Sequence, residues 1–149
     1  MYTCITKNVE ETKELGKKLG KSAKSGMVFL LYGDLGSGKT CLTKGIGLGL
    51  NINATINSPT FNILKIYEGD LTLNHIDAYR LEGINQDLGF DEQIDGEGLT
   101  VIEWPQYIMD TIGDNYLKIE IIINEDDTRT FNFYPYGKEY EVLLKEIVC

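Results

Sequence analysis

Eight residues, Gly33–Thr40, constrain the fold of this chain more than any other stretch, and they read GDLGSGKT. They follow the pattern of a glycine, four residues, then Gly-Lys-Ser/Thr. The run before them, Met27–Tyr32, is continuously apolar, which predicts a short strand buried on both faces. Apolar residues at near-helical spacing follow the loop: Cys41, Leu42, Ile46 and Leu50. Strand, glycine loop and helix form the setting that the motif requires, and they predict an α/β fold.

This loop has the chemistry of a phosphate site. Glycines without a Cβ let the backbone turn sharply, so that its N–H groups can approach phosphate oxygens. The start of the following helix adds unpaired N–H groups and a positive dipole end. We expect Lys39 to reach the β- and γ-phosphates and the Thr40 hydroxyl to bind Mg²⁺. The predicted nucleotide-binding residues are Asp34, Leu35, Gly36, Ser37, Gly38, Lys39, Thr40 and Cys41.

The length of 149 residues predicts one domain, spanning residues 1–149. No apolar run approaches the ~20 residues that cross a bilayer, and the N-terminus lacks the basic-then-apolar layout of a secretory signal. The three cysteines are an odd number without metal-like spacing, and free thiols in a reducing cytosol explain them most simply. We therefore expect a cytoplasmic protein that does not engage a membrane.

The net charge of −9 argues against a chain that grips nucleic acid by itself, because phosphate contacts need clustered lysine and arginine. The acidic residues are unevenly distributed along the sequence. Sixteen of the 23 acidic residues lie between Glu68 and Asp127, against only Arg80 and Lys118. A solvated acidic face is the favoured interpretation, and a docking surface for a basic partner is the alternative.

Hydrophobic periodicity predicts the remaining elements. An amphipathic helix begins near Val9, capped by Thr6 or Asn8, and enters beside the glycine loop, so residues near Val9 are candidates to touch the base. Pro105 suits the first turn of a helix. The other predicted elements are a strand at Tyr2–Thr6, a hairpin over 61–76, a short helix at Gln86–Gln93, a buried strand at Leu99–Ile102, a helix at Gln106–Ile112, a hairpin of Tyr116–Ile123 with Thr128–Tyr134, and a helix at Lys138–Val148.

Two acids stand where a metal-side carboxylate is expected. Asp77 follows the strand Leu71–Ile76, and Glu103 follows Leu99–Ile102. Open α/β sheets bind ligands at the carboxyl ends of their strands. Glu103, on the more buried strand, is the candidate metal ligand, and Asp77 could orient the attacking water or hold a metal-bound water. Together with Lys39 they form the predicted catalytic set, although an acid at a strand end is often only a solvated terminus.

Other residues near these motifs carry weaker signals. Thr60, in Ser58-Pro59-Thr60, lies where segments that sense a γ-phosphate occur, but a simple turn is equally consistent. His75, the only histidine, is predicted to be structural, because no Ser or Cys nucleophile is placed to use it. Trp104 follows the candidate metal ligand; core packing is its default role and an aromatic contact to a partner the alternative.

Arginine is scarce, since the chain has only Arg80 and Arg129. An arginine stabilises the charge that develops in phosphoryl transfer. We therefore expect slow turnover by the isolated chain, with Arg80 or a partner's side chain completing the site. The guanine-reading Asn-Lys-x-Asp signature is absent from the sequence, which favours adenine as the base.

Four motifs in order carry a resemblance to a known family. They are GDLGSGKT at Gly33–Thr40, SPTF at Ser58–Phe61, HIDAYRL at His75–Leu81 and IEWP at Ile102–Pro105, and the N-terminal ETKELGKKLG is similar too. This order and spacing resemble the bacterial TsaE (YjeE) family from about Val9 to Pro105. The chain departs from it modestly: Ser37 stands where alanine is common, Cys41 where threonine is common and Lys44 where arginine is common.

The resemblance implies a three-layer P-loop NTPase fold with a mixed, partly parallel sheet and added antiparallel hairpins. It also implies an Mg²⁺-dependent ATPase that binds and resets the complex of TsaB and TsaD. That complex makes threonylcarbamoyladenosine in the anticodon loop of ANN-reading tRNAs, so tRNA would be met only indirectly. By motif match, Lys39 would hold phosphate, Thr40 and Glu103 would bind Mg²⁺, and Asp77 would assist hydrolysis. Thr60 and Trp104 would belong to nucleotide-sensing and partner surfaces.

Two other classes of function remain open on the sequence alone. One is a small-molecule P-loop kinase, although such kinases usually close an arginine-bearing lid and this chain has two arginines. The other is a nucleotide-binding switch without useful hydrolysis. Transfer of phosphate to a metabolite would favour the kinase. Loss of ATP turnover in Asp77→Ala or Glu103→Ala, with ATP binding kept, would separate the ATPase from the switch, and no loss in either variant would contradict the site assignment.

Overall fold

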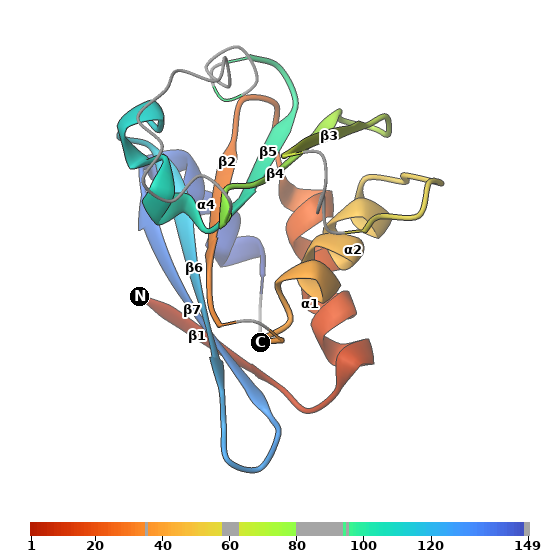
Figure 1. Ribbon diagram of the computed structural model, residues 1–149, viewed down its shortest axis with the longest axis vertical. Coiled ribbons are helices and arrows are strands. Elements are labelled where there is room, and N and C mark those ends of the chain that lie inside the picture. Colours follow the sequence, from red (N-terminus) through yellow and green to blue (C-terminus); the bar gives the residue numbers. More distant parts are fainter. Residues whose placement is uncertain (35, 58–62, 80–93, 95, 148–149) are drawn as a thin grey trace.

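The computed structural model describes residues 1–149 except 35, 58–62, 80–93, 95 and 148–149. Its centre is a seven-stranded mixed sheet in the order β1-β7-β6-β2-β5-β4-β3. Figure 1 shows the helices beside it. The strands are β1 (Tyr2–Thr6), β2 (Val28–Tyr32), β3 (Leu64–Tyr67), β4 (Leu73–Asp77), β5 (Leu99–Glu103), β6 (Tyr116–Ile123) and β7 (Arg129–Tyr136). The helices are α1 (Val9–Ser22), α2 (Lys39–Gly49) and α4 (Lys138–Glu146).

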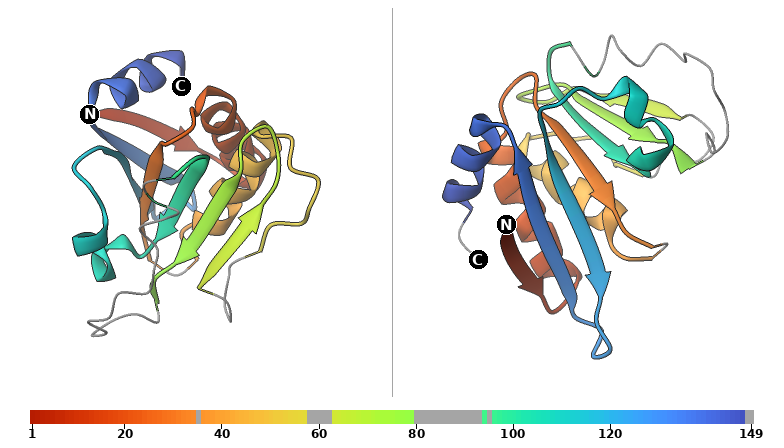
Figure 2. Two further views of the ribbon diagram at one scale, coloured as in Figure 1. Left: turned by 90° about the horizontal axis from the view of Figure 1, so that it is seen from above. Right: turned by 90° about the vertical axis from the view of Figure 1, so that its left-hand side faces the viewer.

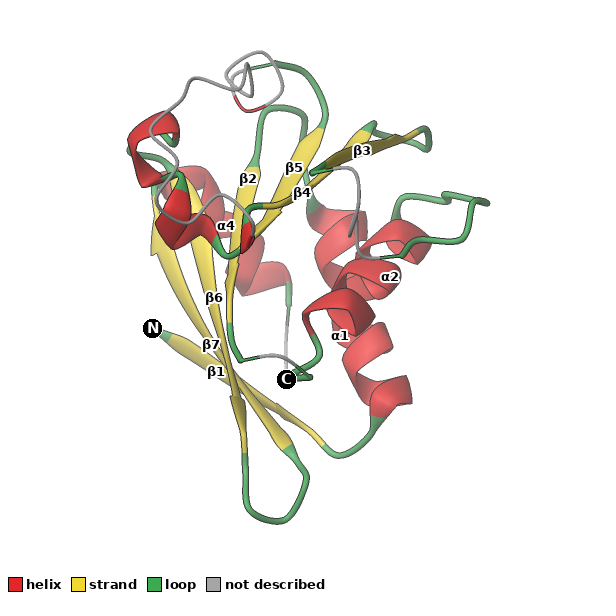
Figure 3. Ribbon diagram, in the orientation of Figure 1, coloured by secondary structure: helices red, strands yellow, loops and turns green. Residues whose placement is uncertain are grey.

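Strand β2 occupies the middle of the sheet and pairs in parallel with both β5 and β6, and β5 in turn pairs in parallel with β4. The antiparallel pairs β3–β4, β6–β7 and β1–β7 extend the sheet on both sides. The predicted α/β class, with a partly parallel sheet and antiparallel hairpins, is confirmed. The carboxyl ends of β2, β4 and β5 meet at one edge (Figure 3), where ligands of parallel sheets bind.

The larger apolar core lies between the sheet and the helices. Leu19 of α1, Leu42 of α2 and Tyr140 of α4 are all buried against strand residues such as Phe29. A smaller core on the opposite face includes Leu30 of β2. It is covered by the short 3₁₀ helices η2 (Pro105–Tyr107) and η3 (Met109–Thr111). Figure 2 shows the helices and these short turns on different sides of the central strands.

Helices α1 and α2 approach unusually closely because glycines face each other across their contact. A Cβ at Gly16 of α1 would collide with the carbonyl oxygen of Leu42, and one at Gly45 of α2 would collide with that of Lys13. Asn8 caps α1 by accepting a hydrogen bond of 2.9 Å from the Glu11 N–H, as one of the two predicted caps. This packing places the first turn of α1 beside the glycine loop.

Two expectations need correction. The helix predicted over Gln106–Ile112 is instead the pair η2 and η3. Ile108 between them has φ −136°, outside the helical region, and the closing hydrogen bonds are of the short i→i+3 kind, such as that from the Ile108 N–H to the Pro105 carbonyl at 2.9 Å.

Cys4 is disulfide-bonded, whereas Cys41 is free, so the expectation of three free thiols is wrong for Cys4. The short helix expected at Gln86–Gln93 lies outside the described residues.

No helix in the described part of the chain is long and apolar enough to cross a membrane.

Candidate nucleotide site

The glycine loop turns the chain from the end of β2 into the start of α2. Gly36 and Gly38 have φ of 80° and 113°, values that other residues adopt only with strain. A Cβ at Gly33 would lie 2.5 Å from the Ser37 hydroxyl and 3.2 Å from the Ile121 carbonyl oxygen, so a larger residue there would require the Ser37 side chain to shift. The Ser37 N–H donates to the Asp34 carbonyl at 3.0 Å and fixes the curvature. Gly36 and Gly38 are therefore required by the geometry of this turn.

The end of this loop presents main-chain donors. The Leu42 N–H donates to the Gly38 carbonyl at 2.9 Å. The amides of Lys39, Thr40 and Cys41 precede that bond in the first turn of α2, where helical N–H groups have no partner within the helix. The helix dipole adds positive potential at the same point. The arrangement attracts an anion.

Lys39 is held beneath the loop rather than in solvent, with 6% of its surface exposed. Its Nζ donates to the Gly33 carbonyl at 2.5 Å and lies 3.8 Å from the centroid of the Trp104 ring. Burial lowers the pKa of the Lys39 ammonium, and the carboxylates of Glu103 and Asp77 act in the opposite direction. The ammonium group is thus a poorly hydrated cation close to the loop.

The two predicted acids face each other at the carboxyl ends of neighbouring strands. Asp77 of β4 and Glu103 of β5 are partners in the parallel register. Glu103 is 3% exposed, and His75 lies 2.6 Å from its Oε2. The Asp77 carboxylate accepts a hydrogen bond of 3.0 Å from the Tyr79 N–H. The prediction that both acids gather near the glycine loop agrees with this geometry.

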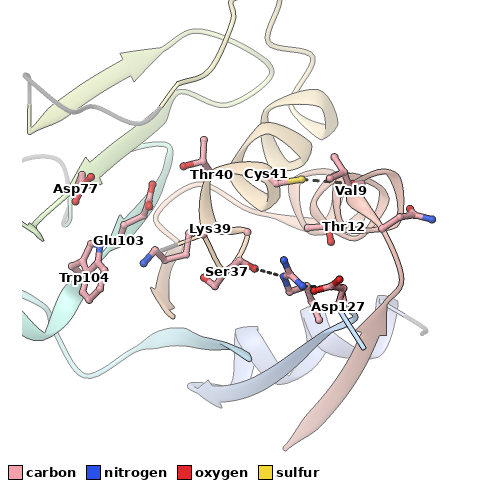
Figure 4. A pocket seen from close by; sticks show the side chains of 14 residues that line it. Val9, Thr12, Ser37, Lys39, Thr40, Cys41, Asp77, Glu103, Trp104 and Asp127 are labelled. Atoms are coloured by element: carbon pink, nitrogen blue, oxygen red, sulfur yellow. Dashed lines mark hydrogen bonds between the residues drawn. The ribbon is translucent and has the colours of Figure 1, made fainter. Parts of the chain in front are cut away.

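One cavity of about 560 Å³ joins these groups (Figure 4). The glycine loop, the first turn of α2, the first turn of α1, the two acids and the turn between β6 and β7 all contribute to its wall. The lining residues are Asn8, Val9, Thr12, Gly36, Ser37, Gly38, Lys39, Thr40, Cys41, Asp77, Glu103, Trp104, Asp127 and Arg129. The side chains of Lys39, Thr40, Asp77 and Glu103 lie toward one end of the cavity. The α1 residues Val9 and Thr12 lie toward the other end.

Asp34, a predicted nucleotide-binding residue, does not line the main cavity. It is exposed and lines a second cavity, of about 460 Å³, together with Tyr32 and Trp104. Cys41 lines the main cavity, and its thiol lies 3.6 Å from the Val9 carbonyl. Burial raises the pKa of that thiol. Leu35, Thr60 and Arg80 fall outside the described residues.

Trp104 is partly buried and packs against the smaller core, in line with the default expectation, but part of the side chain also faces the cavity. Its backbone has φ 57° and ψ 48°, the left-handed region that side chains other than glycine rarely adopt. The Trp104 ring lies 4.9 Å from that of Tyr79, which is 46% exposed. The strained backbone turns the ring toward Lys39 and leaves an aromatic pair beside the cavity.

Sequence reasoning missed Arg129. It lines the cavity, donates from Nε to the Ser37 carbonyl at 3.2 Å and from Nη1 to the Asp127 carbonyl at 2.7 Å. Arg129 therefore ties the β6–β7 turn to the glycine loop across 92 residues of sequence. The only available signal was the scarcity of arginine, and it did not distinguish Arg129 from Arg80.

The fold and the site together define a P-loop protein of the α/β class. The chain belongs to the TsaE family: the family's sequence model, described as "Threonylcarbamoyl adenosine biosynthesis protein TsaE", matches residues 6–131. The resemblance drawn from the four motifs is confirmed.

Individual relatives support membership of this family. A protein of Bacillus subtilis (strain 168) named "tRNA threonylcarbamoyladenosine biosynthesis protein TsaE" is 44% identical over 143 residues, which cover 95% of this chain and 90% of that protein. A protein of the same name from Treponema pallidum (strain Nichols) is 37% identical, with 85% and 95% covered. The crystal structure of Bacillus subtilis YdiB superposes with a TM-score of 0.86 at 37% identity and covers 98% of this chain and 93% of that one.

Proposed function

We propose that this chain is an Mg²⁺-dependent ATPase that acts in the biosynthesis of threonylcarbamoyladenosine on tRNA. In this proposal it binds the TsaB–TsaD complex and uses ATP to reset it between rounds of threonylcarbamoyl transfer to ANN-reading tRNAs. The observation that supports it most is the single cavity lined by Lys39, Thr40, Asp77 and Glu103. Family membership supports the pathway, since the relatives are named for it.

The donor set fits the proposed cofactors. A triphosphate needs main-chain donors and a cation, and the turn from Gly36 to Thr40 with Lys39 supplies both. Mg²⁺ prefers hard oxygen ligands and is usually shared between one or two protein groups and phosphate oxygens. The Thr40 hydroxyl and the Glu103 carboxylate are such ligands. Among the described residues no group of three or more His, Cys, Asp or Glu could hold a metal alone, which is consistent with a metal that arrives with the nucleotide.

Each residue then has a distinct part in hydrolysis. The loop amides and Lys39 hold the β- and γ-phosphates and offset the charge that develops on their oxygens. Asp77 is the more exposed acid of the pair, and it orients the attacking water. Thr40 and Glu103 would hold Mg²⁺, which when bound neutralises charge between the β- and γ-phosphates. The base would lie toward Val9 and Thr12 at the other end of the cavity.

The surroundings of the cavity support a protein partner. Tyr79 and Trp104 form a partly exposed aromatic pair beside Lys39, and aromatic side chains dominate many interfaces. The net charge of −9 supports contact with tRNA only through that partner. Arg80, or a side chain of the partner, would complete the charge stabilisation, so turnover by the isolated chain is slow.

The test is ATP turnover with and without purified TsaB–TsaD, together with tRNA threonylcarbamoylation. Wild-type turnover should be slow alone and rise with the partners. Asp77→Ala and Glu103→Ala should each lower turnover by about 100-fold or more and keep ATP binding in EDTA. Asp110→Ala, which removes an exposed acid of η3 outside the cavity, is the matched control and should change neither. Normal turnover in both site variants would refute the proposed catalytic set.

A further inference from the structure

The only histidine of the chain, His75, is a fully buried polar group for which the proposed mechanism has no use. Its Nε2 lies 2.6 Å from Oε2 of Glu103, and the two side chains are 0% and 4% exposed. A carboxylate removed from water in this way needs a donor, because an unpaired buried charge is very unfavourable. His75 supplies that donor to the residue that would bind the metal.

The strand register explains how one histidine reaches this carboxylate. In the parallel pair β4–β5, His75 lies opposite Val101, and Asp77 lies opposite Glu103. His75 and Asp77 are two residues apart on one strand and share a face of the sheet. The Glu103 side chain therefore has the imidazole on one side and can offer its other oxygen, Oε1, to the cavity that it lines.

The second ring nitrogen identifies the tautomer. His75 Nδ1 is buried and has no hydrogen-bond partner among the described residues. A buried N–H without an acceptor is more unfavourable than a bare nitrogen, whose lone pair accepts only weakly there. The arrangement therefore favours the tautomer with its proton on Nε2, donated to Glu103.

From this geometry we propose that His75 is a positioning residue that fixes the orientation of the Glu103 carboxylate for a divalent cation. The inference rests on the proposed function, because it takes Glu103 as a ligand of nucleotide-bound Mg²⁺. Partners that orient a metal ligand typically contribute 10- to 100-fold to metal affinity. His75 contacts neither phosphate nor water in this scheme, and its effect passes through Glu103.

The test uses His75→Leu, which removes the donor, and His75→Gln, whose amide can still reach Glu103. The readout is the binding of Mn²⁺ to the ATP-bound protein, followed by electron paramagnetic resonance. We expect His75→Leu to bind Mn²⁺ about 10- to 100-fold more weakly, while its ATP affinity in EDTA stays within about twofold of wild type. The Gln variant should recover most of the loss. Wild-type Mn²⁺ affinity in His75→Leu would overturn the inference.

A double-mutant cycle with Glu103→Gln tests whether the effect of His75 on cation binding passes through Glu103. If His75 acts through Glu103, His75→Leu should have no further effect on Mn²⁺ binding in that background. An equal effect in both backgrounds would overturn the inference. If wild type itself shows no cation bound with ATP, the proposed function fails instead, and the two failures are thus distinguishable.

Nuclear magnetic resonance of the wild-type protein gives a readout that does not depend on the folding of any variant. A single histidine yields one set of imidazole signals. We expect them to report the Nε2–H tautomer and to shift when Mg²⁺ is added to the ATP-bound protein. Protonation on Nδ1 alone, or no shift at saturating Mg²⁺, would overturn the assignment.

Discussion

The Nζ atom of Lys39 lies 3.8 Å from the centroid of the Trp104 ring and donates to the Gly33 carbonyl at 2.5 Å. The lysine therefore contacts the carbonyl oxygen of the first residue of the glycine loop. It would have to leave this contact to bind a phosphate. A cation on the face of an indole perturbs that ring electronically. Since Trp104 is the only tryptophan, its emission reports on the position of Lys39.

We predict a saturable change in tryptophan fluorescence when ATP is added. Lys39→Ala should abolish the change, because both the cation and much of the phosphate affinity are lost. Lys118→Ala is the matched control: its ammonium lies 5.0 Å from the Tyr32 ring, outside the cavity, and the change should persist. A full response in Lys39→Ala would show that Trp104 senses something other than this lysine.

Arg129 should strengthen nucleotide binding. It joins the β6–β7 turn to the Ser37 carbonyl and lines the cavity. Hydrogen bonds from charged groups contribute about 1.5–3 kcal/mol, so Arg129→Ala should weaken ATP binding by about tenfold or more. Arg129→Lys keeps the charge but lacks the planar fork, and it should recover only part of the affinity. Isothermal titration calorimetry checks this, and equal affinity in all three proteins would contradict it.

The glycine contact between α1 and α2 should be intolerant of even one methyl group. Gly16→Ala places a Cβ against the Leu42 carbonyl, and overpacking of this kind costs about 1–3 kcal/mol. Gly113→Ala is the control, because a Cβ there meets nothing within 4 Å. Urea unfolding should show the loss only for Gly16→Ala. Equal stability of the two variants would mean that the helices can separate without cost.

Tyr140 links stability to pH. Its hydroxyl oxygen accepts a hydrogen bond of 2.8 Å from the buried Val28 N–H, and burial raises the pKa of the phenol. Above pH ~10 the unfolded chain loses this proton first, so it binds fewer protons than the folded chain and stability falls as pH rises. The slope from this group is about 1.4 kcal/mol per pH unit between the two pKa values.

Tyr140→Phe should therefore have opposite effects in two pH ranges. Near pH 7 it leaves the Val28 N–H without its acceptor and should cost about 1–3 kcal/mol of unfolding free energy. Above pH ~10 its stability should fall less steeply than that of wild type, because Tyr140 no longer titrates. Urea unfolding at both pH values measures this, and parallel curves would exclude Tyr140 as the source.

The sequence predicted the parts of this molecule that local chemistry dictates. The loop glycines need positive φ, so Gly36 and Gly38 could be placed from the motif alone. An alternating pattern located β4, a buried apolar run located β5 and helical spacing located α1, each to within a few residues. Asp77 and Glu103 could be brought to one edge because strand ends of a parallel sheet converge.

The sequence did not predict which residues far apart in the chain contact each other in the fold. The place of Arg129 depends on β6 lying beside β2, and no local pattern encodes that neighbour. The pairing of His75 with Glu103 depends on the β4–β5 register, which is set by the whole core. The helix expected after Pro105 failed because Trp104 adopts a left-handed backbone and Ile108 interrupts the helical conformation.

Calorimetric titration of ATP with Mg²⁺ into the wild-type chain and into Lys39→Ala shows whether the glycine loop binds a triphosphate. We expect one ATP per chain for wild type, and binding at least about tenfold weaker for Lys39→Ala, since a charge-assisted contact to phosphate is lost. Absence of ATP binding by wild type, or equal affinity of the two proteins, would contradict it.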